Sequence, residues 1–360
     1  MLPSPPASIC VLRLSAIGDV CNAVPLLRNL QSAWPKTAIT WLIGTTEASL
    51  VGDIEGIEFL RYDKKTGLLE GRPPRAILAR RRFDLLIHLQ ASWRANALAL
   101  RVRAPVKLGF DRARARDGQW LFTTHRIAPM ANAHVAEGFL SFGDALGVPR
   151  GPRRWDIPLS AADRAFAAAQ IGGDAPVMIL SPCSSQRVRN FRNWPAERYA
   201  AVVREARIRH GVRTILTGGR SELERDYGER ISAQAGVDLV NLIGQTSLKQ
   251  LLALIERALC VLAPDSGPVH MASAVGTPAI GLYATSNPGR TGPLDARWCV
   301  SVYDEAVRRY LGASAQQVRW GRRVRDPAAL ELITVEAVLE RLQAVLDAPP
   351  AVRRPPWLRG

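Results

Sequence analysis

Short apolar runs, each followed by a polar turn and then by a segment with apolar residues at helical spacing, recur along this chain of 360 residues. The first run covers residues 9–14, a turn follows at 15–19, and residues 20–34 then show the helical spacing. A second run at residues 39–43 completes a strand–helix–strand unit. Because uninterrupted apolar runs are typical of strands covered on both faces, the sequence predicts an α/β protein with parallel sheets.

A proline-rich and polar stretch at residues 149–158 interrupts this alternation. After a helical segment at 161–170, the alternation restarts with a strand at 177–180 and continues to a strand at 279–282. Two α/β halves of this kind predict two doubly wound domains with a ligand cleft between them. We expect an N-terminal domain at residues 1–165, a second domain at 166–330, and a C-terminal helix with a basic tail at 331–360.

The charge balance is the most unusual feature of the composition. Lysine and arginine number 48 against 32 aspartate and glutamate residues, so the formal net charge is +16. A protein with this positive charge attracts nucleic acid, anionic lipid or an acidic ligand. A surface that simply uses arginine as its main solvated residue would have the same net charge. Five cysteines form no CxxC pair, which favours a reducing cytosol over a disulfide scaffold. We expect neither a secretory signal nor a segment that spans a bilayer.

The turn after the first strand is a candidate functional loop. It contains Ser15, Gly18 and Asp19, and in open α/β sheets this edge faces the ligand crevice. Gly18 allows close approach of a ligand to the backbone, and Asp19 places a carboxylate at the start of the helix. Two interpretations of Asp19 stay open here: a cap that offsets the helix dipole, or a catalytic carboxylate. The chain lacks GxGxxG, which argues against dinucleotide binding.

A second loop of the same kind follows the strand at 260–263 in the other half. Backbone N–H groups of Ser266 and Gly267 are expected at a helix start, where phosphate binds well, and His270 follows one turn later. Asp265 could equally be a helix cap, and His270 a core histidine.

Two more polar loops follow strands of the second half. Residues 181–195 carry the hydroxyls of Ser184 and Ser185 together with arginines that suit phosphate oxygens, and a solvated basic loop is the alternative. Glu222 follows the strand at 214–217, where a carboxylate could accept hydrogen bonds from ribose hydroxyls. The chain contains no DxD pair and its five histidines are dispersed, so the sequence predicts no metal site.

Four segments together resemble the ADP-heptose:lipopolysaccharide heptosyltransferases, glycosyltransferase family 9, and most closely the heptosyltransferase I branch. The likeness covers roughly residues 8–345 and is strongest in the SxxGD and DSGxxH loops. The segments are LRLSAIGDVCNAVPLLRNLQ, FDLLIHLQASWRANALALRVRAPVKLGF, SPCSSQRVRNFRNWP and APDSGPVHMASAVGTPAIGLYATSNP. The resemblance implies a GT-B fold, in which two Rossmann-like domains face a central cleft. The N-terminal domain would hold the acceptor and the C-terminal domain the nucleotide sugar.

The resemblance also implies roles for individual residues. Asp19 matches the catalytic base, and Arg192 matches a basic residue, commonly lysine, that contacts the pyrophosphate. Glu222 matches an acid that binds the ribose, and Arg94 falls where the family often has an acceptor-domain lysine. The remaining matches are Ser15 and Gly18 on the acceptor side, and Ser184, Ser185, Asp265, Ser266, Gly267 and His270 around the nucleotide sugar.

The activity implied is inverting, metal-independent transfer of a heptose from ADP-heptose to a sugar hydroxyl of the lipopolysaccharide inner core, on an acceptor of the Kdo–lipid A type. ADP-heptose is then a substrate and no cofactor is needed. A cytoplasmic enzyme at the inner face of the membrane is expected, with no nucleic-acid partner. The tail at residues 353–357 could touch that membrane or be disordered. The alternatives are a GT-B enzyme for another nucleotide sugar and a non-catalytic protein that binds polyanions.

Overall fold

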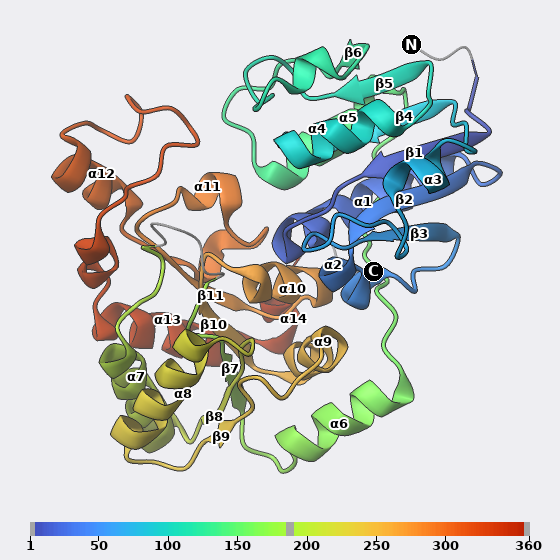
Figure 1. Ribbon diagram of the computed structural model, residues 1–360. Helices are drawn as coiled ribbons and strands as arrows, with labels where there is room; N and C mark the ends of the chain where they lie inside the picture. Colours follow the sequence, from blue (N-terminus) through green and yellow to red (C-terminus); the bar gives the residue numbers. More distant parts are fainter. Residues whose placement is uncertain (1–3, 185–190, 356–360) are drawn as a thin grey trace. The chain divides into compact units, whose positions relative to one another are not determined.

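The computed structural model describes residues 4–184 and 191–355, which divide into two compact units (Figure 1). Unit 1 comprises Met1–Pro158 and unit 2 comprises Leu159–Gly360. The sequence placed the division after residue 165, which lies inside helix α6 (Ala161–Ile171). This helix packs against α9 (Leu248–Arg257) of unit 2, so the whole of α6 belongs to that unit.

Unit 1 is built on a six-stranded parallel sheet in the order β3-β2-β1-β4-β5-β6. Strand β1 is flanked by β2 and β4, with Ile9 opposite Ile39 on one side and Leu85 on the other. The loops after β1 and β4 therefore begin side by side at a switch point of the sheet, where α/β proteins bind ligands. The elements are β1 (Ser8–Leu12), α1 (Ile17–Ala33), β2 (Ala38–Gly44), α2 (Thr45–Val51), β3 (Ile57–Tyr62), α3 (Pro74–Leu78), β4 (Leu85–His88), α4 (Trp93–Arg101), β5 (Val106–Gly109), η1 (Gln119–Leu121), β6 (His125–Arg126) and α5 (Val135–Ala145).

Unit 2 repeats this plan with a six-stranded parallel sheet in the order β12-β11-β10-β7-β8-β9. Here β7 and β10 are neighbours, so the loops that follow them also begin side by side. The elements after α6 are β7 (Val177–Leu180), α7 (Ala196–His210), β8 (Arg213–Leu216), α8 (Glu222–Ala235), β9 (Val240–Asn241), α9, β10 (Cys260–Pro264), α10 (Gly267–Val275), β11 (Ala279–Tyr283), α11 (Pro288–Thr291), η2 (Ala296–Trp298), β12 (Val300–Ser301), α12 (Tyr303–Leu311), η3 (Pro327–Leu332), α13 (Val335–Asp347) and α14 (Pro350–Arg353).

The proline-rich stretch before residue 158 is held on unit 1 by a buried tryptophan. Trp155 is 2% exposed, and its indole donates a hydrogen bond of 2.8 Å to the carbonyl of Cys21 in α1. Arg28 of the same helix donates to the carbonyl of Trp155 at 3.1 Å. The stretch thus ends unit 1 as an ordered part of it.

The C-terminal helix belongs to the core of unit 2, whereas the sequence set residues 331–360 apart. Val338, Leu342 and Val345 of α13 are fully buried in the unit 2 core. The buried indole of Trp194 donates to the carbonyl of Ile333 at 3.1 Å and so fixes the start of this helix. Within the described part of the chain, no helix has the length and apolar character needed to cross a membrane.

Candidate active site

The loop between β1 and α1 presents Asp19 beside Arg13. Asp19 occupies the third position of α1, and its carboxylate forms an ion pair with the guanidinium of Arg13. It also lies 3.5 Å from the backbone nitrogen of Ala16, a long contact of the helix-capping kind. The Asp19 side chain is 35% exposed, whereas that of Arg13 is 11% exposed. The carboxylate therefore has a fixed direction and an open side.

Gln90, which sequence reasoning missed, holds this loop against β4. Its side-chain oxygen accepts hydrogen bonds from the backbone nitrogens of Leu14 at 2.7 Å and Ser15 at 3.2 Å. Its amide nitrogen donates to the hydroxyls of Ser15 at 3.4 Å and Ser92 at 3.3 Å. Because one side chain binds the loops after β1 and β4, Gln90 fixes where Ser15 lies. Gln90 lies just after the end of a predicted strand, and this position is the only feature of the sequence that points to a role in the site.

Arg94 lies in the first turn of α4 and is exposed. The helix is capped by Ser92, whose hydroxyl accepts from the backbone nitrogen of Ala95 at 3.4 Å. Since Ser92 also receives the hydrogen bond from Gln90, the start of α4 is connected to the Ser15 loop. The predicted acceptor-side residues Ser15, Gly18 and Arg94 thus share one edge of the unit 1 sheet.

A buried histidine supports this edge from inside. His88 is fully buried at the end of β4, and its Nε2 lies 3.0 Å from the side-chain oxygen of Asn96. Burial lowers its pKa to about 4, and the charges of Lys107 and Arg13 act in the same direction. The carbonyl of His88 accepts from Gln119 at 2.9 Å. His88 is therefore a neutral structural group that joins β4, α4 and η1.

In unit 2, Asp265 directly follows β10 and is 6% exposed. Its carboxylate accepts a hydrogen bond of 2.8 Å from the hydroxyl of Ser286, which follows β11 and is also buried. The guanidinium of Arg192 donates to the Asp265 carbonyl at 2.9 Å and lies 3.4 Å from its carboxylate. Asp265 therefore orients Arg192. Ser286 was missed by sequence reasoning, because a serine 21 residues away in sequence gives no sign of this contact.

The start of α10 follows Asp265 as predicted from the sequence. Ser266 is the residue before the helix, Gly267 is its first residue, and both are partly exposed. The Ser266 hydroxyl donates to the carbonyl of Pro264 at 3.1 Å, so its side chain does not cap the helix. His270 is 7% exposed. Backbone N–H groups at such a helix start carry partial positive charge, and the guanidinium of Arg192 lies close to them, paired with the carboxylate of Asp265.

The loop after β7 is described only in part. Ser184 is 3% exposed; its backbone nitrogen and its hydroxyl donate to the side-chain oxygen of Asn193 at 2.9 and 3.2 Å. Asn193 is a further residue that the sequence did not single out. Ser185, and the arginines at 187 and 189, lie outside the described residues.

Glu222 is exposed at the first position of α8. The carboxylate of Glu224, two residues later, is by contrast hydrogen-bonded within the loop that precedes the helix. It accepts from the backbone nitrogen of Gly219 at 2.6 Å and from the hydroxyl of Ser221 at 2.5 Å. Of the two carboxylates at this strand end, Glu222 is the one that faces solvent.

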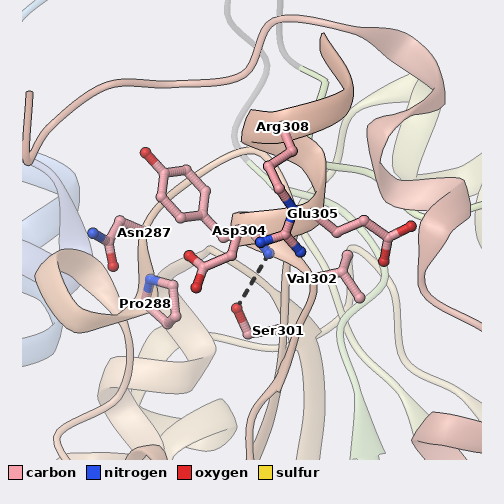
Figure 2. Close-up of a pocket in the computed structure, with 8 residues that line it drawn as sticks. Asn287, Pro288, Ser301, Val302, Asp304, Glu305 and Arg308 are labelled. Carbon is pink, nitrogen blue, oxygen red and sulfur yellow. Dashed lines mark hydrogen bonds between the residues drawn. The ribbon is translucent and has the colours of Figure 1, made fainter. Parts of the chain in front are cut away.

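A cavity of about 470 Å³ opens beside the end of β12 (Figure 2). Asn287, the residue after Ser286, lines it together with Asp304 and Arg308 of α12. Ser301 and Tyr303 also line it, and the backbone nitrogen of Tyr303 donates to the hydroxyl of Ser301 at 3.4 Å. Across residues 4–184 and 191–355, no group of three or more His, Cys, Asp or Glu side chains is placed to hold a metal ion.

Comparison with known proteins identifies the family of this chain. The profile of Glycosyltransferase family 9 (heptosyltransferase) matches residues 75–310. The lipopolysaccharide core heptosyltransferase OpsX of Haemophilus influenzae is 38% identical over 94% of this chain and 96% of its own length. Lipopolysaccharide heptosyltransferase 1 of Salmonella typhimurium is 24% identical over 79% of this chain and 90% of its own length.

Solved structures show the same architecture at low sequence identity. A family 9 glycosyltransferase from Veillonella parvula superposes with a TM-score of 0.76 at 23% identity, over 94% of this chain and 97% of its own. The Escherichia coli heptosyltransferase WaaC with ADP gives 0.71 at 18% identity, over 94% and 99%. This chain belongs to glycosyltransferase family 9, the heptosyltransferases, and is a glycosyltransferase with the GT-B fold.

Proposed function

We propose that this enzyme transfers a heptose from ADP-heptose to a sugar hydroxyl of the lipopolysaccharide inner core, with inversion at the anomeric carbon. The observation that carries the proposal is the pairing of Arg192 with Asp265 at the start of α10. That pairing places a guanidinium next to N–H groups of a helix start, which suits a diphosphate. The 38% identity to a core heptosyltransferase supports heptose and lipopolysaccharide as the substrates.

In the proposed reaction, Asp19 removes the proton from the acceptor hydroxyl as that oxygen attacks the anomeric carbon. The bond from this carbon to the β-phosphate oxygen breaks, and ADP leaves with the electron pair. Arg13 holds the carboxylate in position, and Gln90 holds the loop that carries Ser15 and Gly18. Arg94 lies at the same sheet edge, where its charge would attract an anionic acceptor.

Unit 2 would hold the donor. Arg192 and the N–H groups of Ser266 and Gly267 would meet the charge that develops on the departing diphosphate, with His270 one turn along the helix. The resemblance assigns Ser184 and Ser185 to the same diphosphate, although in the structure Ser184 donates both its backbone N–H and its hydroxyl to Asn193. Glu222 would accept hydrogen bonds from the ribose. No metal ion or cofactor takes part in this scheme.

We also propose that the enzyme works as a peripheral protein on the cytoplasmic face of the inner membrane. An acceptor of the Kdo–lipid A type is anchored there and carries phosphates and carboxylates. The net charge of +16 favours such a surface, and this attraction weakens as salt screens it.

The direct test supplies purified protein with ADP-heptose and a water-soluble Kdo disaccharide, detects the product by mass spectrometry and assigns its anomeric configuration by NMR. We expect one heptose to be added, and we expect the product linkage to be inverted relative to the donor. UDP- and GDP-sugars serve as competing donors. Transfer from one of these without transfer from ADP-heptose would assign the chain to another nucleotide sugar.

A binding experiment separates the catalytic proposal from a non-catalytic polyanion binder. ADP at about 100 times its dissociation constant should stabilise the protein by ~2.7 kcal/mol, whereas UDP, GDP and NAD should do so less. Tight binding to duplex DNA at physiological salt, without stabilisation by ADP, would contradict the proposal.

A further inference from the structure

Helix α4 carries apolar side chains on its outer face as well as on its inner face. Trp93 is 65% exposed and Leu100 is 63% exposed. Ala97, also exposed, lies between them, so the three residues follow the i, i+4, i+7 spacing of one helix face. The inner face buries Ala95 and Leu98. An outward stripe of this kind contributes nothing to the core.

A second exposed apolar pair lies close to the start of this helix. Trp120 and Leu121 of η1 are 40% and 65% exposed. The turn before them is bound to α4, because the carboxylate of Asp117 accepts from the backbone nitrogen of Trp93 at 3.2 Å. The carbonyl of Asp117 also accepts from the side chain of Asn96 at 2.7 Å. We call the side chains of Trp93, Ala97, Leu100, Trp120 and Leu121 the α4–η1 face.

Positive charge surrounds the α4–η1 face. Residues 93–126 contain eight lysine and arginine residues against two aspartates. One aspartate is bound to the start of α4, and the other, Asp111, pairs with Arg114. Arg94, Arg101, Arg112 and Arg116 are exposed. The guanidinium of Arg112 lies 5.7 Å from the ring centroid of Trp120, so charge and aromatic surface are presented together.

We propose that the α4–η1 face docks onto a lipid surface that carries anionic headgroups. Exposed tryptophan favours the boundary between headgroups and acyl chains, and long arginine side chains reach from an apolar contact to phosphates above it. The inference adds to the proposed function by assigning its membrane contact to unit 1 rather than to the basic tail.

The test is sedimentation of the full chain with vesicles and needs neither substrate nor turnover. Vesicles of phosphatidylethanolamine with phosphatidylglycerol are compared with vesicles of phosphatidylcholine alone. The variants are Trp93→Ser/Leu100→Ser and Trp120→Ser/Leu121→Ser. Ile208→Ser is the matched control, because Ile208 of α7 is 67% exposed and belongs to unit 2. Thermal unfolding and circular dichroism confirm that each variant is folded.

We expect the wild type and Ile208→Ser to bind the anionic vesicles and to bind phosphatidylcholine at least tenfold more weakly. Each double variant should partition roughly tenfold less, since it removes two large apolar side chains. Equal binding by all proteins, or no binding by the wild type, would overturn the proposal. Self-association of the wild type that both double variants lose, without vesicle binding, would instead make this face an interface between copies. Failure of the proposed function would show separately, as absent transfer to the soluble acceptor.

Discussion

Asp19 combines two features that separate experiments can distinguish: it is the third residue of a helix, and it is paired with a nearly buried arginine. We predict that Asp19→Ala lowers kcat by about 10²- to 10⁴-fold, because a positioned general base contributes about that much. ADP affinity should not change, since the proposed donor site belongs to unit 2. Initial rates and calorimetric titration with ADP provide the measurements.

Asp163 offers a matched control for this prediction. It is also the third residue of its helix, and its carboxylate accepts from the backbone nitrogen of Ser160 at 3.1 Å. Asp163→Ala should cost only the stability of a capping contact, about 1 kcal/mol, with kcat unchanged. If Asp19→Ala behaved in the same way, Asp19 would be a cap and the base would have to be another residue.

Arg192 is predicted to recognise the diphosphate and not the nucleoside. Arg192→Ala should weaken ADP binding by roughly 10- to 100-fold, because a hydrogen bond to a charged group is worth ~1.5–3 kcal/mol. Adenosine binding should change little. Arg198→Ala is the control, because Arg198 donates to the carbonyls of Glu331 and Ile333, both at 2.6 Å. An equal loss of ADP and adenosine affinity in Arg192→Ala would place its charge away from the diphosphate.

Strand β4 ends in a titratable group that couples stability to pH. The pKa of His88 is lowered by burial to about 4, from an ordinary value of 6.5. Between these values the unfolded chain binds a proton that the folded protein does not. The free energy of unfolding should therefore fall by up to about 3 kcal/mol as pH is lowered from about 6.5 to 4. Urea unfolding across this range measures the effect.

The variant His88→Gln should lose less stability on acidification than the wild type, although it starts from a lower stability at neutral pH. An unchanged pH profile in His88→Gln would mean that other groups account for the acid sensitivity.

Helix α13 is expected to be essential to unit 2. Leu342 is fully buried between this helix and the rest of the core. Leu342→Ala should destabilise the protein by roughly 2–5 kcal/mol, because it removes buried methyl groups and leaves a cavity. Glu340→Ala, on the exposed side of the same helix, should change stability by less than about 0.5 kcal/mol. Similar denaturation midpoints for the two variants would contradict the packing described.

For the whole molecule, the scheme predicts transfer without a metal ion. Protein groups neutralise the departing diphosphate, so the initial rate in excess EDTA should match the rate in Mg²⁺ or Mn²⁺ within about twofold. EDTA-treated enzyme assayed with and without added metal tests this. A rate that vanished with EDTA and returned with Mn²⁺ would mean that carboxylates distant in sequence hold an ion, and the proposed mechanism would be wrong.

A buried central strand and two amphipathic helices with one buried face were predicted well from the sequence, whereas an edge strand and two further helices were not. The strand at 177–180 and the helices at 196–210 and 248–257 have the predicted bounds. Strand β3 at the sheet edge was missed, because its residues alternate between buried and exposed and form no apolar run. Helices α4 and α5 were missed as well; α4 carries apolar residues on both faces and so lacks the usual polar side.

The sequence by itself determined the two α/β halves and the strand-end loops that carry Asp19 and Asp265, because burial of parallel strands dictates apolar runs and leaves polar residues at their ends. Only the tertiary structure decided the partners of those residues. Arg13, Gln90, Ser286 and Asn193 contact the predicted site residues from other positions in the chain. Such contacts form because neighbouring strands bring their carboxyl ends together. Side chains that form hydrogen bonds across many residues of sequence follow no periodic pattern, so a single sequence does not reveal them.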